Sequence, residues 1–424
     1  MSTSAAQVQR TYLLLTLLTT LAASFIWGIN TLFLLDAGLS NLEAFSANAF
    51  FTVGMMVFEV PTGVVADIRG RRLSFLLGAA TLSAGTVLYV LLWWWEAPFA
   101  AWAVVSIVLG LGFTFFSGAQ EAWLVDALSA TGYRGSLDRV FGRGQAVTGA
   151  AQLSGSVLGG LLAQVSSLGV PFVVRAALLL VTFAVAFAVM HDLGFSPVRD
   201  RSPVREGRRI LDDSLRYGLG QPAVRWIMLT GPFLGGVSIY AFYAMQPYLL
   251  ELYGDSDAYV IAGLAAAIVA GAQIVGGLVV LRLRRVFRRR TSLLMVAAAV
   301  GSAALLLVGL APVFGLVVVL LMLWGLSDAA ATPVRQAYLN ALIPTQQRAT
   351  VLSFNSLLES GGGVVVQPAL GRVADVSGYA PTFVLSAVIQ AAALPFMVLA
   401  RRTGSSADRP IEEAPGVSND AESA

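Results

Sequence analysis

Residues 63–72 read GVVADIRGRR, and this stretch decides how the rest of the chain is interpreted. It closes an apolar run that already contains one acid, Glu59. Asp67 lies at the end of the run, where a carboxylate is costly at a membrane edge unless it has a partner. Arg71, four residues later, is a suitable partner because Gly70 permits a tight turn.

The composition places this stretch in a membrane. Of the 424 residues, 57% are hydrophobic and 12% are charged, and the mean hydropathy is +0.76. A soluble protein of this length cannot bury so much apolar surface, so the bilayer is the expected solvent. The first apolar run is too long for a cleavable signal peptide and lacks an A-x-A site, so we expect it to remain as the first span.

The residue types that are missing exclude several functions. The chain has no Cys and a single His, His191, and all 27 basic residues are Arg. A thiolate or histidine-pair metal site is therefore not expected, and a Walker A loop is excluded because it requires Lys. The pI of about 9.3 indicates loops facing anionic lipid rather than a nucleic-acid partner. We expect no metal and no cofactor.

Twelve apolar runs are long enough to cross a bilayer, which takes roughly 20 residues. A polar linker, residues 192–221, divides them six and six. One end of these runs holds 25 of the 27 Arg residues, the exceptions being Arg175 and Arg372. By the positive-inside rule both termini are predicted to be cytoplasmic. The predicted spans are 12–36, 42–66, 73–95, 99–128, 140–165, 170–191, 222–250, 258–281, 291–310, 313–342, 349–373 and 379–400.

The two halves of the chain resemble each other. Three pairs of segments align in order: 33–40 with 248–255, 118–124 with 333–339, and 160–178 with 371–388. Duplicated six-span halves related by an axis along the membrane normal are a transporter architecture, with substrate near the midplane. We therefore predict an all-α membrane protein of two pseudo-symmetric six-helix bundles. The expected domains are a bundle over 1–191, the linker 192–221, a bundle over 222–402 and a disordered cytoplasmic tail over 403–424.

The spacing within 63–72 resembles the loop signature Gly-x-x-x-Asp-x-x-Gly-Arg-Arg of the major facilitator superfamily, and the resemblance extends over about 10–402. In the second half, 277–290 keeps the Arg cluster but has Leu281 at the Asp position. The resemblance implies an Asp–Arg–Asp chain that latches the halves in an outward-facing state; the alternative is an ordinary topogenic Arg cluster. Gly63 is expected to allow close approach of a neighbouring helix. The gate motif comprises Gly63, Asp67, Gly70, Arg71, Arg72 and Asp126.

The fifth span contains a run of glycines, GSVLGG, over 155–160. It resembles the antiporter signature Gly-Pro-x-x-Gly-Gly of the same superfamily, with Ser156 in place of the proline. Without that proline the helix need not kink. Gly155, Gly159 and Gly160 still permit close packing against the other half, and the resemblance favours export. Generic small-residue packing is the alternative.

Four acids within the spans are candidate proton carriers, because an acid at mid-span costs about 2.5–3.5 kcal/mol and is usually partnered or functional. The repeat counterparts of Glu59 and Glu121 are Gln273 and Gln336, which do not titrate. Glu121 is preferred, since Arg143 or Arg335 could stabilise its ionised form; the alternative for each acid is a structural ion pair. The candidates are Glu121, Glu59, Asp328 and Glu359.

Aromatic and polar residues within the spans are candidates for the wall of a substrate cavity. Three of them lie three residues apart in the seventh span and are expected on one helix face. The alternative is packing or an interfacial aromatic belt. The cavity candidates are Trp27, Asn30, Gln120, Arg143, Tyr240, Tyr243, Gln246 and Arg335, whereas His191 is expected at the membrane interface.

These features predict a multi-pass, monomeric secondary transporter of the cytoplasmic (inner) membrane. The preferred function is proton-coupled efflux of a hydrophobic or amphipathic small molecule, with the substrate, protons and lipid as its partners. The alternative is nutrient uptake by proton symport or facilitated diffusion. An integral-membrane enzyme is not expected, because the spans offer no His for base chemistry, no nucleophile elbow and no cluster of metal ligands. The sequence does not identify the substrate.

Overall fold

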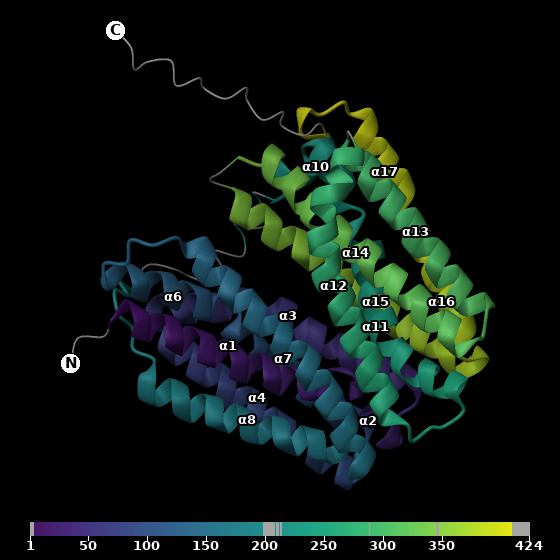
Figure 1. The fold of residues 1–424 in the computed structure, drawn as a ribbon, viewed down its shortest axis with the longest axis horizontal. Coiled ribbons are helices and arrows are strands. Elements are labelled where there is room, and N and C mark those ends of the chain that lie inside the picture. The colour runs from purple at the N-terminus through teal and green to yellow at the C-terminus, as the bar shows by residue number, and fades with distance from the viewer. Residues whose placement is uncertain are drawn as a thin grey trace.

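The computed structural model describes residues 4–197, 214–287, 289–344 and 347–408, together with Arg208 and Asp212. These described residues form helices and connecting turns, with no strand among them. Figure 1 shows two helical bundles, one from each half of the chain, that diverge from a shared interface. The all-α fold with two bundles that the sequence predicts is confirmed.

The N-terminal bundle contains the first six predicted spans, two of which are interrupted. The first span breaks at Gly28, which packs against the backbone of Gly263 in the other bundle. The fourth breaks at Ser117 and Gly118, where Gly118 adopts a φ of +70°, a conformation that favours glycine. The helices are α1 (Ala5–Trp27), α2 (Asn30–Asp36), α3 (Asn41–Arg69), α4 (Arg71–Trp94), α5 (Phe99–Phe116), α6 (Ala119–Ala130), α7 (Leu137–Val165) and α8 (Gly169–Val189).

The C-terminal bundle contains the other six spans, with breaks after Met228 and at Ala392. A π-helical turn, Ser214–Leu219, precedes the bundle, and a short 3₁₀ turn, Ser406–Asp408, follows it. The helices are α10 (Pro222–Met228), α11 (Gly231–Tyr253), α12 (Tyr259–Val286), α13 (Arg290–Leu310), α14 (Phe314–Leu342), α15 (Arg348–Ser377), α16 (Tyr379–Ala391) and α17 (Ala393–Arg402).

The first residues of the predicted tail are packed rather than disordered. The Asp408 side chain is 4% exposed and accepts hydrogen bonds from the Thr291 backbone N–H (2.8 Å) and the Thr291 hydroxyl (3.0 Å). It thereby satisfies a backbone donor in the first turn of α13. Residues 409–424, and residues 198–207, 209–211 and 213 of the predicted linker 192–221, lie outside the described residues.

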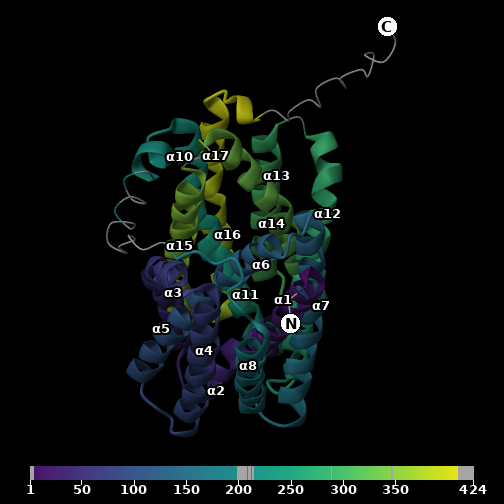
Figure 2. The same cartoon turned by 90° about the vertical axis from the view of Figure 1, so that its left-hand side faces the viewer.

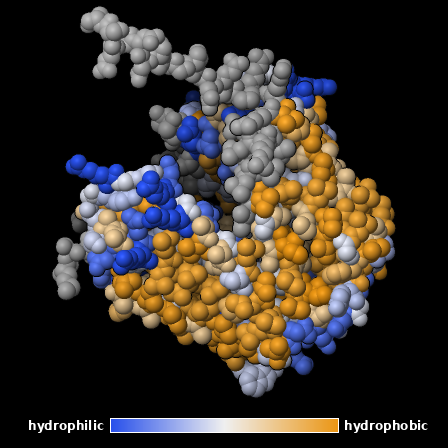
Figure 3. Space-filling view, in the orientation of Figure 1, coloured by the Kyte–Doolittle hydropathy of each residue, from blue (hydrophilic) through white to orange (hydrophobic). Residues whose placement is uncertain are grey.

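Within the described residues, 10 of the helical spans are long and apolar enough to cross a membrane. The other two predicted spans correspond to α12 and α15. These helices lie at the interface between the bundles, where α12 packs against α7 and α15 against α3 (Figure 2). A helix that faces protein rather than lipid carries more glycine and polar side chains, which explains the lower apolarity of α15. Figure 3 shows that apolar residues cover much of the visible face of both bundles.

Aromatic packing fixes the core of the N-terminal bundle. Phe33 of α2 stacks on Phe172 of α8 with ring centroids 3.9 Å apart. Trp102 is fully buried and lies 4.9 Å from Tyr89, whose hydroxyl shares a hydrogen bond with Ser106. Offset and edge-to-face aromatic pairs add to the energy of area burial. This core holds α8 in a fixed position relative to α4.

The two bundles contact each other at the end opposite the Arg clusters. We call the end that carries 69–72, 134–143 and 289–290 the arginine-rich end, and the other the opposite end. At the opposite end, the Asp375 carboxylate of α15 accepts hydrogen bonds from the backbone N–H groups of Asn41 (2.7 Å) and Leu42 (3.0 Å). These are the first donors of α3, which have no partner within the helix itself.

Gln246 makes a second connection between the bundles and is fully buried. Its side-chain oxygen accepts a hydrogen bond from the Thr31 N–H (2.9 Å), and its amide donates to the Trp27 carbonyl (2.7 Å). Trp27 and Thr31 flank the break between α1 and α2, so Gln246 binds backbone groups that the interruption leaves free. Figure 3 shows a hollow between the bundles at the arginine-rich end, so this conformation is open there and closed at the opposite end.

Candidate functional site: the central cavity

A cavity of about 550 Å³, which we call the main cavity, is lined by helices of the N-terminal bundle. Its wall combines hydroxyl, amide and charged groups with apolar side chains, a composition typical of small-molecule sites. The break between α5 and α6 contributes Ser117 and Gly118, and irregular backbone inside a membrane protein is tolerated where it lines such a cavity. The polar and charged lining residues are Thr19, Thr20, Ser117, Gln120, Glu121, Thr148, Gln152 and Arg175.

A second cavity of about 280 Å³ adjoins the first, because Trp27 lines both. Its remaining wall comes from the C-terminal bundle and is mainly aromatic and aliphatic. Phe242, Tyr243 and Trp324 supply the aromatic surface, and Trp27 lies 6.1 Å from Phe242 in an edge-to-face arrangement. The N-terminal bundle thus contributes hydroxyl, amide and charged groups among apolar side chains that include Phe113 and Phe116, and the C-terminal bundle contributes a mainly aromatic and aliphatic wall.

Glu121 lies in the first turn of α6 and lines the main cavity. Its side chain is exposed and makes no hydrogen bond or ion pair with any residue that the structure describes. The neighbouring Gln120 is held differently, because its amide donates to the Thr16 hydroxyl (2.7 Å). Glu121 is therefore accessible from the cavity, so its carboxylate can bind or release a proton there and can contact a bound molecule.

The other candidate proton carrier of the N-terminal bundle, Glu59, lies on α3 and is exposed. It does not line the two cavities described above. The side chain of its predicted repeat counterpart, Gln273, lies outside the described residues.

The gate motif forms a chain of charges at the arginine-rich end. The Arg71 guanidinium lies 2.6 Å from the Asp67 carboxylate, and its Nε is 3.9 Å from the Asp126 carboxylate. All three residues belong to the N-terminal bundle, so in this conformation they join α3, α4 and α6. Gly63 does not contact a neighbouring helix here: it is exposed, and a Cβ at this position would meet nothing within 4 Å.

Asp192, which the sequence analysis did not single out, is part of the same cluster. Its carboxylate accepts a hydrogen bond from the Arg72 backbone N–H (2.8 Å) at the start of α4, and it occupies the space beside Gly70. Gly70 has a φ of +106°, and a side chain there would collide with the Asp192 carboxylate. The sequence contained a signal for this role, because Asp192 is an acid that directly follows an apolar span at the arginine-rich end.

The glycines of α7 permit close contacts on two sides. A Cβ at Gly155 would lie 2.5 Å from Ser24 of α1, and one at Gly159 would overlap the carbonyl oxygen of Phe25. Only Gly160 faces the other bundle, where a Cβ would lie 3.0 Å from the Cα of Gly263 in α12. The expected packing between halves thus involves one of the three predicted glycines, and the other two pack within their own bundle.

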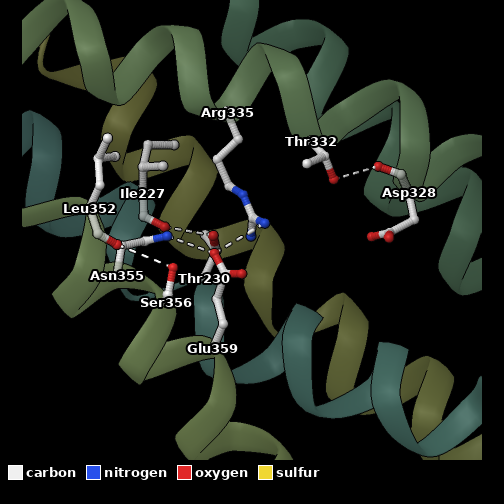
Figure 4. Close-up of polar contacts among 9 residues, drawn as sticks. All are labelled: Ile227, Thr230, Asp328, Thr332, Arg335, Leu352, Asn355, Ser356 and Glu359. Carbon is white, nitrogen blue, oxygen red and sulfur yellow. Dashed lines mark hydrogen bonds and ion pairs between the residues drawn. The ribbon is translucent and has the colours of Figure 1, made fainter. Parts of the chain in front are cut away.

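Figure 4 shows the charged cluster of the C-terminal bundle. Arg335 of α14 lies 3.1 Å from the Glu359 carboxylate of α15, and the Asn355 amide donates to the same carboxylate (2.6 Å). Arg335 thus pairs with Glu359 rather than with Glu121 in this conformation. Asp328 lies two helical turns before Arg335 and lines a cavity of about 20 Å³ inside the C-terminal bundle.

The predicted cavity residues divide into two groups. Trp27, Gln120 and Tyr243 line the two main cavities, whereas the other five lie elsewhere. Asn30 donates to the Asn48 side chain (2.9 Å), Tyr240 packs 4.7 Å from Phe45, and Gln246 joins the bundles. Tyr240 and Gln246 both contact the N-terminal bundle, and of the three α11 residues only Tyr243 lines a cavity. Arg143 is exposed on α7, and Arg335 is paired as described.

Arg175, Thr148, Gln152 and Trp324 line the cavities although the sequence analysis did not propose them. A signal for Arg175 was present, since it is one of two Arg residues outside the arginine-rich end. Thr148, Gln152 and Trp324 have no comparable signal, because such residues occur throughout the spans.

His191, predicted at the interface, is exposed, and its carbonyl accepts a hydrogen bond from the Trp123 indole (2.7 Å).

Comparisons with known proteins agree with this architecture. The Major Facilitator Superfamily profile matches residues 12–364 and 285–420, whereas no curated protein matches in sequence. The nucleoside transporter NupG is similar in fold, with a TM-score of 0.77, 11% identity, and coverage of 92% of this chain and 99% of the other.

Two further solved structures show the same fold. A bacterial homologue of the human lysosomal transporter Spinster, in an inward-facing and unoccupied conformation, has a TM-score of 0.73 and 15% identity, covering 97% of this chain and 100% of the other. The D-xylose-proton symporter has a TM-score of 0.63 and 16% identity, covering 91% and 96%. These identities support the fold alone. By the profile match, this chain is a multi-pass membrane transporter, not an enzyme, and it belongs to the major facilitator superfamily.

Proposed function

We propose that the protein exports an amphipathic small molecule across the cytoplasmic membrane in exchange for protons, by alternating access between its two bundles. The observation that carries this proposal is the Glu121 carboxylate, which lies in the wall of the main cavity and has no hydrogen-bond or ion-pair partner among the described residues. A carboxylate that the substrate and a proton can both reach is the minimal requirement for coupling their movements.

The nature of the cavity wall supports an amphipathic substrate. One bundle presents hydroxyls, amides and charges, and the other presents Phe242, Tyr243 and Trp324. Aromatic rings supply large apolar contact area, while a few polar groups orient the bound molecule. Drug-sized ligands bind in sites of roughly 300–1,000 Å³. The main cavity, at about 550 Å³, lies within this range, and the adjoining cavity, at about 280 Å³, lies just below it.

The proposed orientation in the membrane and the proposed direction of transport rest on sequence features and on the open arginine-rich end of the structure. If the arginine-rich end is cytoplasmic, both termini are cytoplasmic and the present conformation is open to the cytoplasm. In the alternate state the arginine-rich end would close, and Asp67, Arg71 and Asp126 would then hold it shut. The glycine pattern of α7 favours export, as its resemblance to the antiporter signature implies.

Proton symport is a second candidate, and one observation favours it. Arg175 lines the same cavity as Glu121. If the substrate carries a negative charge, protonation of Glu121 would remove a repulsive charge, so the proton and the substrate would bind together rather than in competition. The two mechanisms predict opposite dependence on the pH gradient, which makes them separable.

The direction is tested in cells that overexpress the protein. Export predicts lower accumulation of at least one toxic amphipathic compound, and a protonophore should abolish the difference. Cells expressing Glu121→Gln provide the matched control, because this substitution removes the charge and keeps the size of the side chain. Increased accumulation of a nutrient would instead support uptake and contradict export.

A further inference from the structure

Arg175 is placed where a membrane protein rarely keeps a cation. It is the seventh residue of α8 (Gly169–Val189), about 9 Å along the helix from its first residue. The α8 N-terminus lies at the opposite end, so Arg175 is remote from the Arg clusters. On insertion scales, an arginine at the centre of a span costs about 2.5–3.5 kcal/mol. Arg175 lies between the end and the centre of its span, so its cost is lower than this, but an ionisable residue within a span usually has a partner or a function.

No residue that the structure describes neutralises Arg175. Its Nε has no accessible surface and no hydrogen-bond partner, and it forms no ion pair or cation–π contact among the described residues. The phenols of Tyr89 and Tyr243 lie near it but carry no charge near neutral pH, and Tyr89 already shares a hydrogen bond with Ser106. Structural ion pairing therefore does not account for this guanidinium.

The surroundings of Arg175 are suited to a ligand with an acidic head and an apolar body. Arg175 lines the main cavity together with Trp27. Trp27 and Tyr243 also line the adjoining aromatic cavity, which extends to Trp324. Tyr243 belongs to the C-terminal bundle, so a ligand held at Arg175 would touch both bundles. A transporter requires such contact, because the bound substrate has to influence how the halves move relative to each other.

We propose that Arg175 binds the acidic group of the substrate, and that the substrate class is amphipathic organic anions bearing a carboxylate, sulfonate or phosphate. The planar guanidinium forms paired hydrogen bonds with the oxygens of such groups. The apolar part of the molecule occupies the aromatic cavity between Trp27 and Trp324. The inference rests on the transport function proposed above, since it names the kind of molecule transported. An anionic substrate favours the symport form of that function, because protonation of Glu121 in the same cavity would then assist its binding.

The test compares two fluorescent probes that share an aromatic skeleton. The anion is 8-anilinonaphthalene-1-sulfonate, and the neutral probe is N-phenyl-1-naphthylamine, which lacks the sulfonate. Binding to the full chain in lipid nanodiscs is measured by energy transfer from tryptophan, because Trp27 and Trp324 line the cavities. Empty nanodiscs correct for partition into lipid.

We expect Arg175→Gln to weaken binding of the anionic probe roughly ten- to a hundredfold, the range for loss of a charge-assisted hydrogen bond. Arg175→Lys should restore part of that affinity, because it keeps the charge without the planar fork. Binding of the neutral probe should change less than about twofold, which also shows that the variant is folded. Arg372→Gln, which removes the other Arg outside the arginine-rich end at an exposed position, should leave both affinities unchanged.

Two results would overturn the inference. Unchanged binding of the anion in Arg175→Gln would show that the guanidinium holds no acidic group. Equal loss of both probes, with no recovery in Arg175→Lys, would show that Arg175 acts only in packing. The assay uses no pH gradient, so its outcome is independent of export. A chain that binds the anion through Arg175 but shows no proton-coupled movement would sustain this inference and refute the proposed function.

Discussion

The contact between Asp375 and the start of α3 (Asn41–Arg69) allows a quantitative prediction about the conformational equilibrium. Ser40 and Glu43 form a capping box that satisfies the third N–H of the helix, that of Glu43. The first two donors, Asn41 and Leu42, are left to the Asp375 carboxylate, at 2.7 and 3.0 Å. These bonds break when the opposite end opens, and water replaces the carboxylate.

The size of the effect follows from the exposure of the site. A hydrogen bond contributes a net 0.5–1.5 kcal/mol to stability, and hydrogen bonds to solvent-exposed charged groups contribute amounts near the lower end of this range. We take about 1 kcal/mol for both bonds together, which corresponds to a roughly fivefold change in a conformational equilibrium. Asp375→Ala should therefore shift the population about fivefold toward the state that is open at the opposite end.

The assay is a distance distribution from double electron–electron resonance. The chain contains no Cys, so Trp95→Cys and Val313→Cys place labels at exposed positions, 68% and 60% exposed, on the two bundles at the opposite end. Asp375→Ala should increase the long-distance population. The control Asp255→Asn removes an acid whose described hydrogen bond stays within its own loop, and it should have no effect. Equal widening in both variants, or none in Asp375→Ala, would refute the reasoning.

Three further perturbations test other parts of the molecule. Gly263→Val should prevent close contact between α7 and α12, because even a Cβ at this position would lie 2.5 Å from the Ser156 carbonyl oxygen. The spin labels at positions 95 and 313 should then report longer distances between the bundles at the opposite end, and an unchanged distance distribution would contradict this packing. Asp67→Asn or Arg71→Ala should slow turnover while leaving substrate affinity within about twofold, and loss of binding with normal turnover would argue against a gate. A double-mutant cycle of Arg335→Met and Glu359→Gln should give a thermal-denaturation coupling of about 0.5–3 kcal/mol, and additive effects would show that the pair contributes nothing.

The sequence predicted the spans and the charged end well, because both depend on local features. Apolar runs locate helices in a membrane regardless of their partners, and the spacing of Asp67 and Arg71 brings their charges together, at 2.6 Å. The break at Gly118 was not predicted. An isolated glycine within an apolar run is compatible with a continuous helix, and only its φ of +70° distinguishes the two.

The cavity was harder to predict because its wall is assembled from segments that are distant in sequence. Gln246 appeared suitable for a substrate contact, but it binds Thr31 and Trp27 in the other bundle. The sequence contains no information on which bundle each face of α11 contacts. Arg175 was noticed only as an exception to the charge distribution. Its significance emerges once the phenols and the cavity around it are seen together.

The central claim is that movement of the substrate is exchanged for protons through Glu121. The most direct measurement uses proteoliposomes and a panel of amphipathic compounds, with the lumen made acidic in one arm and the exterior made acidic in the other. The account predicts that an acidic lumen drives accumulation of at least one compound by the wild-type chain. Glu121→Gln should lose this response while still exchanging labelled for unlabelled compound. Accumulation driven by an acidic exterior instead, or by neither gradient, would contradict proton antiport.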